Sequence, residues 1–220
     1  MAPSPRSGLR VAAFIVGGIG LVFALAGAAV AHVIPRLVAA EHARLTALPS
    51  PGARAVESTP VGTEVLVDGR IDGKQPLRFR DFVAYAKEEE ERDAKRREQF
   101  GDWKVVEKVT PPLALVTGDG IVRIVDDAYA ITFAETRWYD RSKIIDTAYV
   151  GLLANEDVFV HGRVAAGGLD AIAVGSGTRA SYLDTVGGNV AVAWWLGVGF
   201  QAVGGVMVLA GIGMWVAARR

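Results

Sequence analysis

Residues 190–220 read VAVAWWLGVGFQAVGGVMVLAGIGMWVAARR, and this stretch decides the class of the fold. It carries no charge before its last two residues, and it is long enough for one helix to cross a hydrocarbon core about 30 Å thick. Tryptophans stand near both ends, as at the two interfaces of a bilayer, and arginines follow at once. We therefore predict a transmembrane helix over residues 190–216. Its interfacial anchors are Trp194, Trp195, Trp215, Arg219 and Arg220.

A second uncharged stretch, residues 11–33, reads VAAFIVGGIGLVFALAGAAVAHV and also predicts a transmembrane helix. A cleaved signal peptide is the alternative, because Arg6 and Arg10 precede the stretch and Ala29-Val30-Ala31 fits a small-x-small cleavage site. The apolar run is longer than the roughly 7 to 15 residues of a signal core, which favours a retained anchor.

Two membrane spans place both ends of the chain on the same side of the membrane. The arginines at the two ends of the chain make that side the cytoplasm by the positive-inside bias. Arg36 and Arg44, which follow the first span, reduce the difference in basic residues between the two sides. We therefore expect residues 1–10 and 217–220 to be cytoplasmic and residues 34–189 to be extracytoplasmic.

Small residues recur at helical spacing in both spans, and such ridges let helices approach closely in lipid. The alternative is that glycine and alanine are simply frequent in the spanning helices of an alanine-rich chain. Gln201 is polar and lies in mid-span, where it can hydrogen-bond to a neighbouring helix. The residues expected to pack against another helix are Gly20, Ala24, Ala28, Ala193, Gly197, Gln201, Gly213 and Ala217.

The region between the spans divides into a stalk, a β domain and a linker. Residues 34–60 are expected to begin as a short amphipathic helix that ends at Pro49 to Gly52. Residues 61–178 show many short apolar runs separated by turn residues, which favours a small β barrel or sandwich. Residues 179–189 are expected to link this domain to the second span. The strands are predicted near residues 65–69, 77–87, 103–109, 113–116, 121–125, 158–164 and 172–174.

Two polar features stand out in the β domain. Gly118-Asp119-Gly120 lies between two alternating runs and predicts a tight hairpin turn. The charge run over residues 87–98 is expected to form the solvated tip of a long hairpin between the Tyr85 and Trp103 strands. A protein-docking surface is the alternative for this run.

The composition narrows the possible functions. Lysine and arginine together number 24, as do aspartate and glutamate, so the chain has no basic excess for nucleic acid. It has no cysteine, which excludes disulfides, zinc–cysteine clusters and thiol nucleophiles. We expect no nucleic-acid ligand.

Few residues point to catalysis, and we expect no catalytic group, metal or cofactor. The imidazoles are His32, His42 and His161, and a histidine on a strand such as His161 is most often structural. No serine lies in a GxSxG elbow. The aspartates Asp126, Asp127 and Asp140 lack the spacing of a calcium loop and are expected in solvated turns.

The order of several residues resembles the GIDE domain, which lies between two membrane helices in membrane-bound ubiquitin ligases of mitochondria and chloroplasts and in prokaryotic proteins of unknown role. The resemblance covers roughly residues 60–175 and implies a β domain with a binding or assembly role. The ligases carry a zinc-binding RING after the second helix, whereas this chain has no cysteine and stops at Arg220, so we expect no ligase activity. The resemblance rests on Tyr85, Glu88, Trp103, Pro112, Gly118, Gly120, Gly151 and Gly162.

Taken together, these features predict a membrane-anchored, non-enzymatic module that binds protein partners or serves as an accessory subunit of a membrane complex. A membrane-tethered domain that binds a small molecule or lipid is the second hypothesis, because small β barrels can hold one ligand. A hydrolase that uses Asp126, Asp127 or His161 is the third, and it requires these groups to converge in one pocket.

Overall fold

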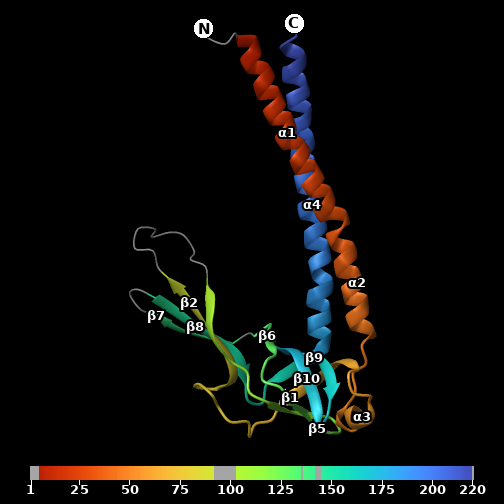
Figure 1. Ribbon diagram of the computed structural model, residues 1–220, viewed down its shortest axis with the longest axis vertical. Coiled ribbons are helices and arrows are strands. Elements are labelled where there is room, and N and C mark those ends of the chain that lie inside the picture. Colours follow the sequence, from red (N-terminus) through yellow and green to blue (C-terminus); the bar gives the residue numbers. More distant parts are fainter. Residues whose placement is uncertain (1–4, 92–102, 135, 142–144, 220) are drawn as a thin grey trace. The chain divides into compact units, whose positions relative to one another are not determined.

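A computed structural model describes residues 5–91, 103–134, 136–141 and 145–219 of the chain. These residues form two compact units, which are described separately. One unit is Met1–Thr46 with Leu183–Arg220, and the other is Ala47–Tyr182. The first consists of helices, whereas the second is mainly β-sheet (Figure 1).

Two segments are long and apolar enough to cross a membrane, as the sequence predicts. Gly8–Ala47 reaches a mean hydropathy of 2.3 in its most apolar window, and Arg179–Ala217 reaches 1.7. The first contains α1 (Pro5–His32) and α2 (Ile34–Ala47), and the second is α4 (Arg179–Ala217). The helix expected after Pro35 is therefore present as α2.

Residues 179–189, which were expected to link the β domain to the second span, are helical and form the first turns of α4. The helix begins earlier because Thr178 caps it, with the Ser181 amide donating to the Thr178 hydroxyl oxygen over 3.2 Å. Gly187 and Gly188 lie within these first turns of α4. They are weak helix formers, but the cap and the apolar run beyond them keep the backbone helical.

Helices α1 and α4 pack antiparallel through small residues. A Cβ added to Gly197 would lie 2.4 Å from the Ala31 nitrogen, and one added to Gly204 would lie 2.4 Å from the Ala24 nitrogen. Gly211 makes the next such contact, towards the start of α1. These α4 glycines recur every seven residues, so one face of the helix stays against its partner along its length.

The second unit contains a closed barrel of five strands. The order β5-β4-β1-β9 is that of a Greek key, and β10 pairs with β9. β10 also runs parallel to β5, with Leu169 opposite Ile124, and so closes the ring. This is the five-stranded architecture of OB-fold domains. The bounds are β1 Glu64–Ile71, β4 Leu113–Thr117, β5 Gly120–Ile124, β9 Asp157–Ala165 and β10 Gly168–Ser176, and β6 (Ala130–Thr132) pairs farther along β10.

The barrel interior is filled by alternate residues of its strands. Val65, Val67 and Ile71 of β1 are buried in one apolar cluster with residues of the other barrel strands. Tyr129 also lies in this cluster and donates its hydroxyl to the Pro111 carbonyl over 2.8 Å. Burial raises the pKa of Tyr129 well above its ordinary value. Of the two predicted architectures, a small β barrel or a sandwich, the structure has the barrel.

The predicted hairpin turn at residues 118–120 is present and also holds a short helix, α3 (Ala53–Ser58). Asp119 accepts hydrogen bonds from the Thr117 hydroxyl over 2.8 Å and from the Ala53 amide over 2.7 Å. The first of these contacts and then the second lower the pKa of the Asp119 carboxyl. Asp119 thus caps α3, a role that the turn pattern alone did not predict.

A second, four-stranded sheet is added to the barrel, and we call it the outer sheet. Its order is β3-β2-β8-β7, with bounds β2 Phe82–Glu91, β3 Lys104–Val109, β7 Thr136–Arg141 and β8 Ile145–Leu153. The β2–β3 pair is inserted between barrel strands β1 and β4, and the β7–β8 pair between β5 and β9. β2 and β8 join the two pairs, and the sheet extends away from the barrel (Figure 1).

The outer sheet departs from the predicted strands in two ways. The strand expected over residues 77–87 begins only at Phe82, because Arg78 to Asp81 form a turn in which Arg80 adopts a φ of +50°. Strands β6, β7 and β8 were not predicted. The expected hairpin between the Tyr85 and Trp103 strands is confirmed by the pairing of β2 with β3. The charge run was expected to form its tip, but residues 87–91 lie within β2, where neighbouring strands pair with them. Residues 92–98 of the run lie outside the described residues.

Candidate functional site

One face of the outer sheet carries an aromatic cluster. Phe79 stacks on Tyr149 with ring centroids 4.2 Å apart, and Trp138 lies 5.5 Å from Tyr149. Tyr85 packs 5.7 Å from Phe79, and the Arg80 guanidinium lies 3.8 Å above the Trp138 ring. Such a cation–π contact covers one side of Trp138. The cluster draws on β2, β7, β8 and the turn before β2, so it forms only when the two inserted pairs meet.

Tyr85 connects this aromatic face to an acidic group. Its hydroxyl donates to Glu107 Oε1 over 2.8 Å. Burial and then the hydrogen bond to Glu107 raise the pKa of Tyr85 to about 12, because both disfavour the phenolate. Tyr85 therefore stays a neutral hydrogen-bond donor at physiological pH and is a structural residue in this sheet.

The outer half of β2 carries consecutive glutamates although β2 is an inner strand of its sheet. Glu88 pairs with Arg137 over 3.3 Å, and Glu89 pairs with Lys87 over 2.6 Å. Side chains alternate across a strand, so both faces of the sheet become polar here. Both pairs are partly exposed and contribute little to stability.

Exposed apolar side chains lie on β3 and β7, the two opposite edge strands of the outer sheet. Val105 is 59% exposed and Val106 is 52% exposed on β3, and Tyr139 is exposed on β7. A bulge in the β2–β3 pairing leaves Val106 without a residue opposite it. Trp103, also exposed, meets Tyr139 edge-on with centroids 6.3 Å apart. We call these four residues the apolar edge.

A pocket of about 500 Å³ lies between α3, β5 and the turn from β9 to β10. Val56 and Val164 form part of its apolar wall, and Glu57 and Arg123 supply opposite charges. Neither charged side chain has a hydrogen-bond or ion-pair partner among the residues that the structure describes. The pocket therefore offers an apolar floor with two available charges.

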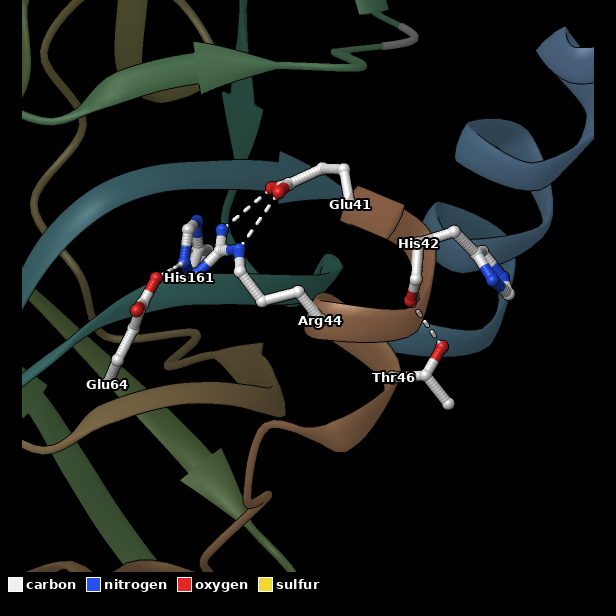
Figure 2. A network of polar contacts seen from close by, with 6 residues as sticks. All are labelled: Glu41, His42, Arg44, Thr46, Glu64 and His161. Atoms are coloured by element: carbon white, nitrogen blue, oxygen red, sulfur yellow. Dashed lines mark hydrogen bonds and ion pairs between the residues drawn. The ribbon is translucent and has the colours of Figure 1, made fainter. Parts of the chain in front are cut away.

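The predicted histidines do not form a metal site within the described part of the chain, where no group of three or more potential ligands occurs. His161 Nε2 lies 2.6 Å from Glu64 Oε1, and Figure 2 shows the two side chains facing each other. His42 accepts a hydrogen bond at its carbonyl from Thr46, and it lies on α2, as Figure 2 also shows. His32 is exposed at the end of α1.

The aspartates considered for a hydrolase have structural contacts. Asp126 Oδ1 accepts the Ala171 amide over 2.8 Å at the bulge of β10, and its other oxygen accepts the Ala128 amide. The Asp127 carbonyl accepts the Thr110 hydroxyl. Asp140 lies within β7, so its expected place in a turn is wrong. His161 pairs with Glu64, and no contact joins it to Asp126 or Asp127 among the described residues.

The small residues expected to pack in the membrane fall on different faces of their helices. Gly20, Ala24 and Gly197 lie between α1 and α4. A Cβ added to Gly27 would lie 2.6 Å from the backbone nitrogen of Gln201, so the Gln201 backbone lies close to α1. Ala28 and Ala193 are half-buried, whereas Gly213 and Ala217 are exposed and face away from α1. The glycines 204 and 211, which carry much of the contact, were not predicted although they continue the seven-residue spacing.

The expected interfacial residues lie at two places along α4: the tryptophan pair lies inside the helix, and Trp215 lies near its C-terminal end. Trp194 and Trp195 are exposed and adjacent, with centroids 4.7 Å apart. Trp215 lies under the Arg219 guanidinium at 3.4 Å. Arg220 lies outside the described residues.

The positions that carry the GIDE resemblance serve packing and turns. A Cβ on Gly151 would lie 2.3 Å from the Ala84 carbonyl oxygen, and one on Gly162 would lie 2.5 Å from that of Asp170. Both glycines therefore permit close strand pairing. Tyr85, Glu88 and Trp103 lie in or beside the outer sheet as described above, Pro112 precedes β4 with its carbonyl bound by Gln75, and Gly118 and Gly120 flank the Asp119 turn.

The fold thus defines a class of protein: two long apolar helices that bracket a five-stranded barrel with an added outer sheet. Comparison with protein-family models, with curated proteins and with solved structures found no match.

Proposed function

We propose that this chain is a membrane-anchored, non-enzymatic module whose outer sheet binds a protein partner, as an accessory subunit of a membrane complex. The apolar edge carries the proposal. Exposed aromatic and aliphatic groups that lie together are typical of interaction surfaces, and aromatic residues often dominate their energetics. The outer sheet does not take part in barrel closure, so it is available for such a role.

The helix pair supplies the anchor in this proposal. Both helices cross the membrane, the two ends of the chain are cytoplasmic, and residues 34–189 are extracytoplasmic. Protease added outside sealed vesicles should then digest the β domain only when the extracytoplasmic face of the membrane is on the outside of the vesicle. Digestion of the two tails from that same side would contradict the topology.

The GIDE relationship belongs to this proposal as well. The position of a β domain between two apolar helices supports it, as does the order of its motif residues. It implies an assembly role for the domain and no ligase chemistry in this chain, because no cysteine is present to bind the zinc of a RING.

The test is purification from native membranes in mild detergent with variants of the apolar edge. Trp103→Ala together with Val106→Lys removes an aromatic anchor and places a charge at the bulge, so bound partners should be lost. Ile172→Lys on β10 is the matched control, because Ile172 is also an exposed apolar strand residue, at 45%. Recovery of the unmodified chain strictly alone, or equal partner recovery from both variants, would overturn the proposal.

A second candidate function is the binding of a small molecule in the pocket beside α3. The two available charges, Glu57 and Arg123, favour a ligand with an apolar body and a polar or ionised end. Native mass spectrometry should detect a co-purifying molecule that is lost from Arg123→Gln. The absence of any bound molecule from freshly purified protein would count against this function.

A further inference from the structure

An apolar groove runs along the surface of the helix pair between α1 and α4. It has a volume of about 400 Å³. Small residues hollow it out, because Gly17, Gly18 and Gly211 carry no side chains there. Its walls are Ala13, Phe14 and Leu21 on α1 and Val208, Ile212 and Trp215 on α4. At a rise of about 1.5 Å per residue, the seven steps from Phe14 to Leu21 give a groove about 10 Å long.

An arginine lies at the same end of each wall of the groove, where α1 begins and α4 ends. Arg10 precedes Phe14 by four residues and Leu21 by eleven, so it continues the α1 stripe that lines the groove. Arg219 lies over the Trp215 ring, 3.4 Å from its centroid, and Trp215 is itself a wall residue. The Arg10 guanidinium donates to the Ala218 carbonyl over 3.5 Å, which brings the two ends together.

These guanidinium groups retain hydrogen-bond donors. The Arg219 guanidinium has no hydrogen-bond acceptor among the described residues, and the Arg10 guanidinium has only the long contact to Ala218. Planar guanidinium groups bind phosphate oxygens in pairs, and basic groups at the end of membrane helices attract anionic headgroups. The Trp215 ring beside them is typical of the headgroup level of a bilayer.

We propose that this groove binds one anionic phospholipid, with its phosphate between Arg10 and Arg219 and the upper part of an acyl chain against Gly18. The inference rests on the membrane insertion in the proposed function and is independent of the partner at the apolar edge. An apolar groove suits an acyl chain, and two cationic groups at its mouth select an anionic over a zwitterionic headgroup.

The test is native mass spectrometry of the full chain in detergent, titrated with phosphatidylglycerol or with phosphatidylcholine of the same acyl chains. We expect preferential retention of one phosphatidylglycerol. Replacing Arg10 and Arg219 by glutamine should weaken that binding by about fivefold for each arginine and leave phosphatidylcholine unaffected. Equal binding of the two lipids by the unmodified protein would overturn the proposal.

A matched pair of variants tests the groove itself. Gly18→Leu fills it, and an added Cβ at Gly18 meets no atom within 4 Å, so the helix pair should persist. Gly213→Leu is equally open but lies outside the groove. Loss of the lipid only from Gly18→Leu supports the site, and its retention by Gly18→Leu overturns it. If Gly18→Leu disturbs the helices, the arginine variants decide the question alone.

The two proposals fail separately. If alkaline carbonate released the chain from native membranes, the chain would not be inserted in the membrane, and both proposals would fail. An inserted chain that shows no preference for phosphatidylglycerol would overturn the lipid site and leave the apolar edge untouched.

Discussion

Replacing Gly168 by alanine should open the barrel between β5 and β10. A Cβ at this position would lie 2.1 Å from the Arg123 carbonyl oxygen, 3.0 Å from the Arg123 carbonyl carbon and 3.1 Å from Val125 Cγ1. The nearest of these atoms belong to the backbone, so no side-chain rotation relieves the overlap. The two strands must therefore separate by at least about 1 Å to restore an ordinary van der Waals contact.

The expected loss of stability follows from the contacts between β5 and β10 around Gly168. Forcing an extra carbon into a packed site costs about 1 to 3 kcal/mol. Separation also breaks the hydrogen bond from the Val125 amide to the Leu169 carbonyl, 2.9 Å long, at about 1 kcal/mol. Alanine returns about 0.5 kcal/mol by restricting the unfolded chain. The net loss is about 1.5 to 3.5 kcal/mol, or roughly a 10- to 400-fold change in the opening equilibrium.

Hydrogen exchange followed by mass spectrometry of the full chain in detergent measures this change. Amides of β5 and β10 should exchange faster in Gly168→Ala by about that factor. Gly118→Ala is the control, because a Cβ there meets no atom within 4 Å and should change little. Equal exchange in the two variants would refute the reasoning and show that β5 and β10 do not close the barrel.

Three further predictions concern the helices, α3 and the outer sheet. Gly204→Leu should abolish disulfide cross-linking of a cysteine pair introduced across α1 and α4, because Gly204 lies against the α1 backbone. Gly205→Leu should preserve the cross-linking, because a Cβ there meets nothing within 4 Å. Equal cross-linking in the two variants would show that Gly204 does not face α1. The pKa of Asp119, lowered by the Thr117 hydroxyl and then by an amide of α3, lies below its ordinary 3.8 in the folded state. The ionised Asp119 therefore stabilises α3 above pH 3.8, and this stabilisation is lost as the pH falls through the lowered pKa. Hydrogen exchange of the α3 amides should become faster over that pH range in the unmodified chain but not in Asp119→Asn. Tyr85→Phe should destabilise the β2–β3 pairing by about 1 kcal/mol and abolish a phenol titration near pH 12 in the absorbance spectrum, and an unchanged titration would place that ionisation elsewhere.

The helices and the local hairpins could be predicted because their signals are short-range. An uncharged run of some 20 residues has few structures open to it other than a long helix. The turn at residues 118–120 likewise combines local backbone freedom with alternating strands on either side. The first strand of the β domain was likewise predicted, and its Val65 and Val67 belong to the core cluster.

The missed elements had weak or conflicting local signals. β7 reads TRWYDR, in which polar residues leave no clear apolar alternation, and it is held by pairing with β8. The glutamates at the end of β2 have low strand propensity, and neighbouring strands on both sides outweigh it. Residues 179–189 contain two glycines, and the helix there depends on a cap and on its long continuation.

The candidate surfaces depended still more on tertiary structure. Trp103 and Tyr85 were noticed through a family resemblance, but Tyr139 and Phe79 were not. These side chains come from segments far apart in the chain and meet only when β2 pairs with β8. No local pattern encodes that pairing.

The sequence by itself determined two long apolar helices, a β domain between them, and the absence of cysteine chemistry. These properties follow from composition and from contacts between near neighbours. Only the tertiary structure decided that β5 and β10 close a barrel, that Gly197 and Gly204 face α1 while Gly213 faces away, and that two inserted strand pairs form one outer sheet. The physical reason is that register and close backbone approach depend on partners distant in the chain, which local propensity does not specify.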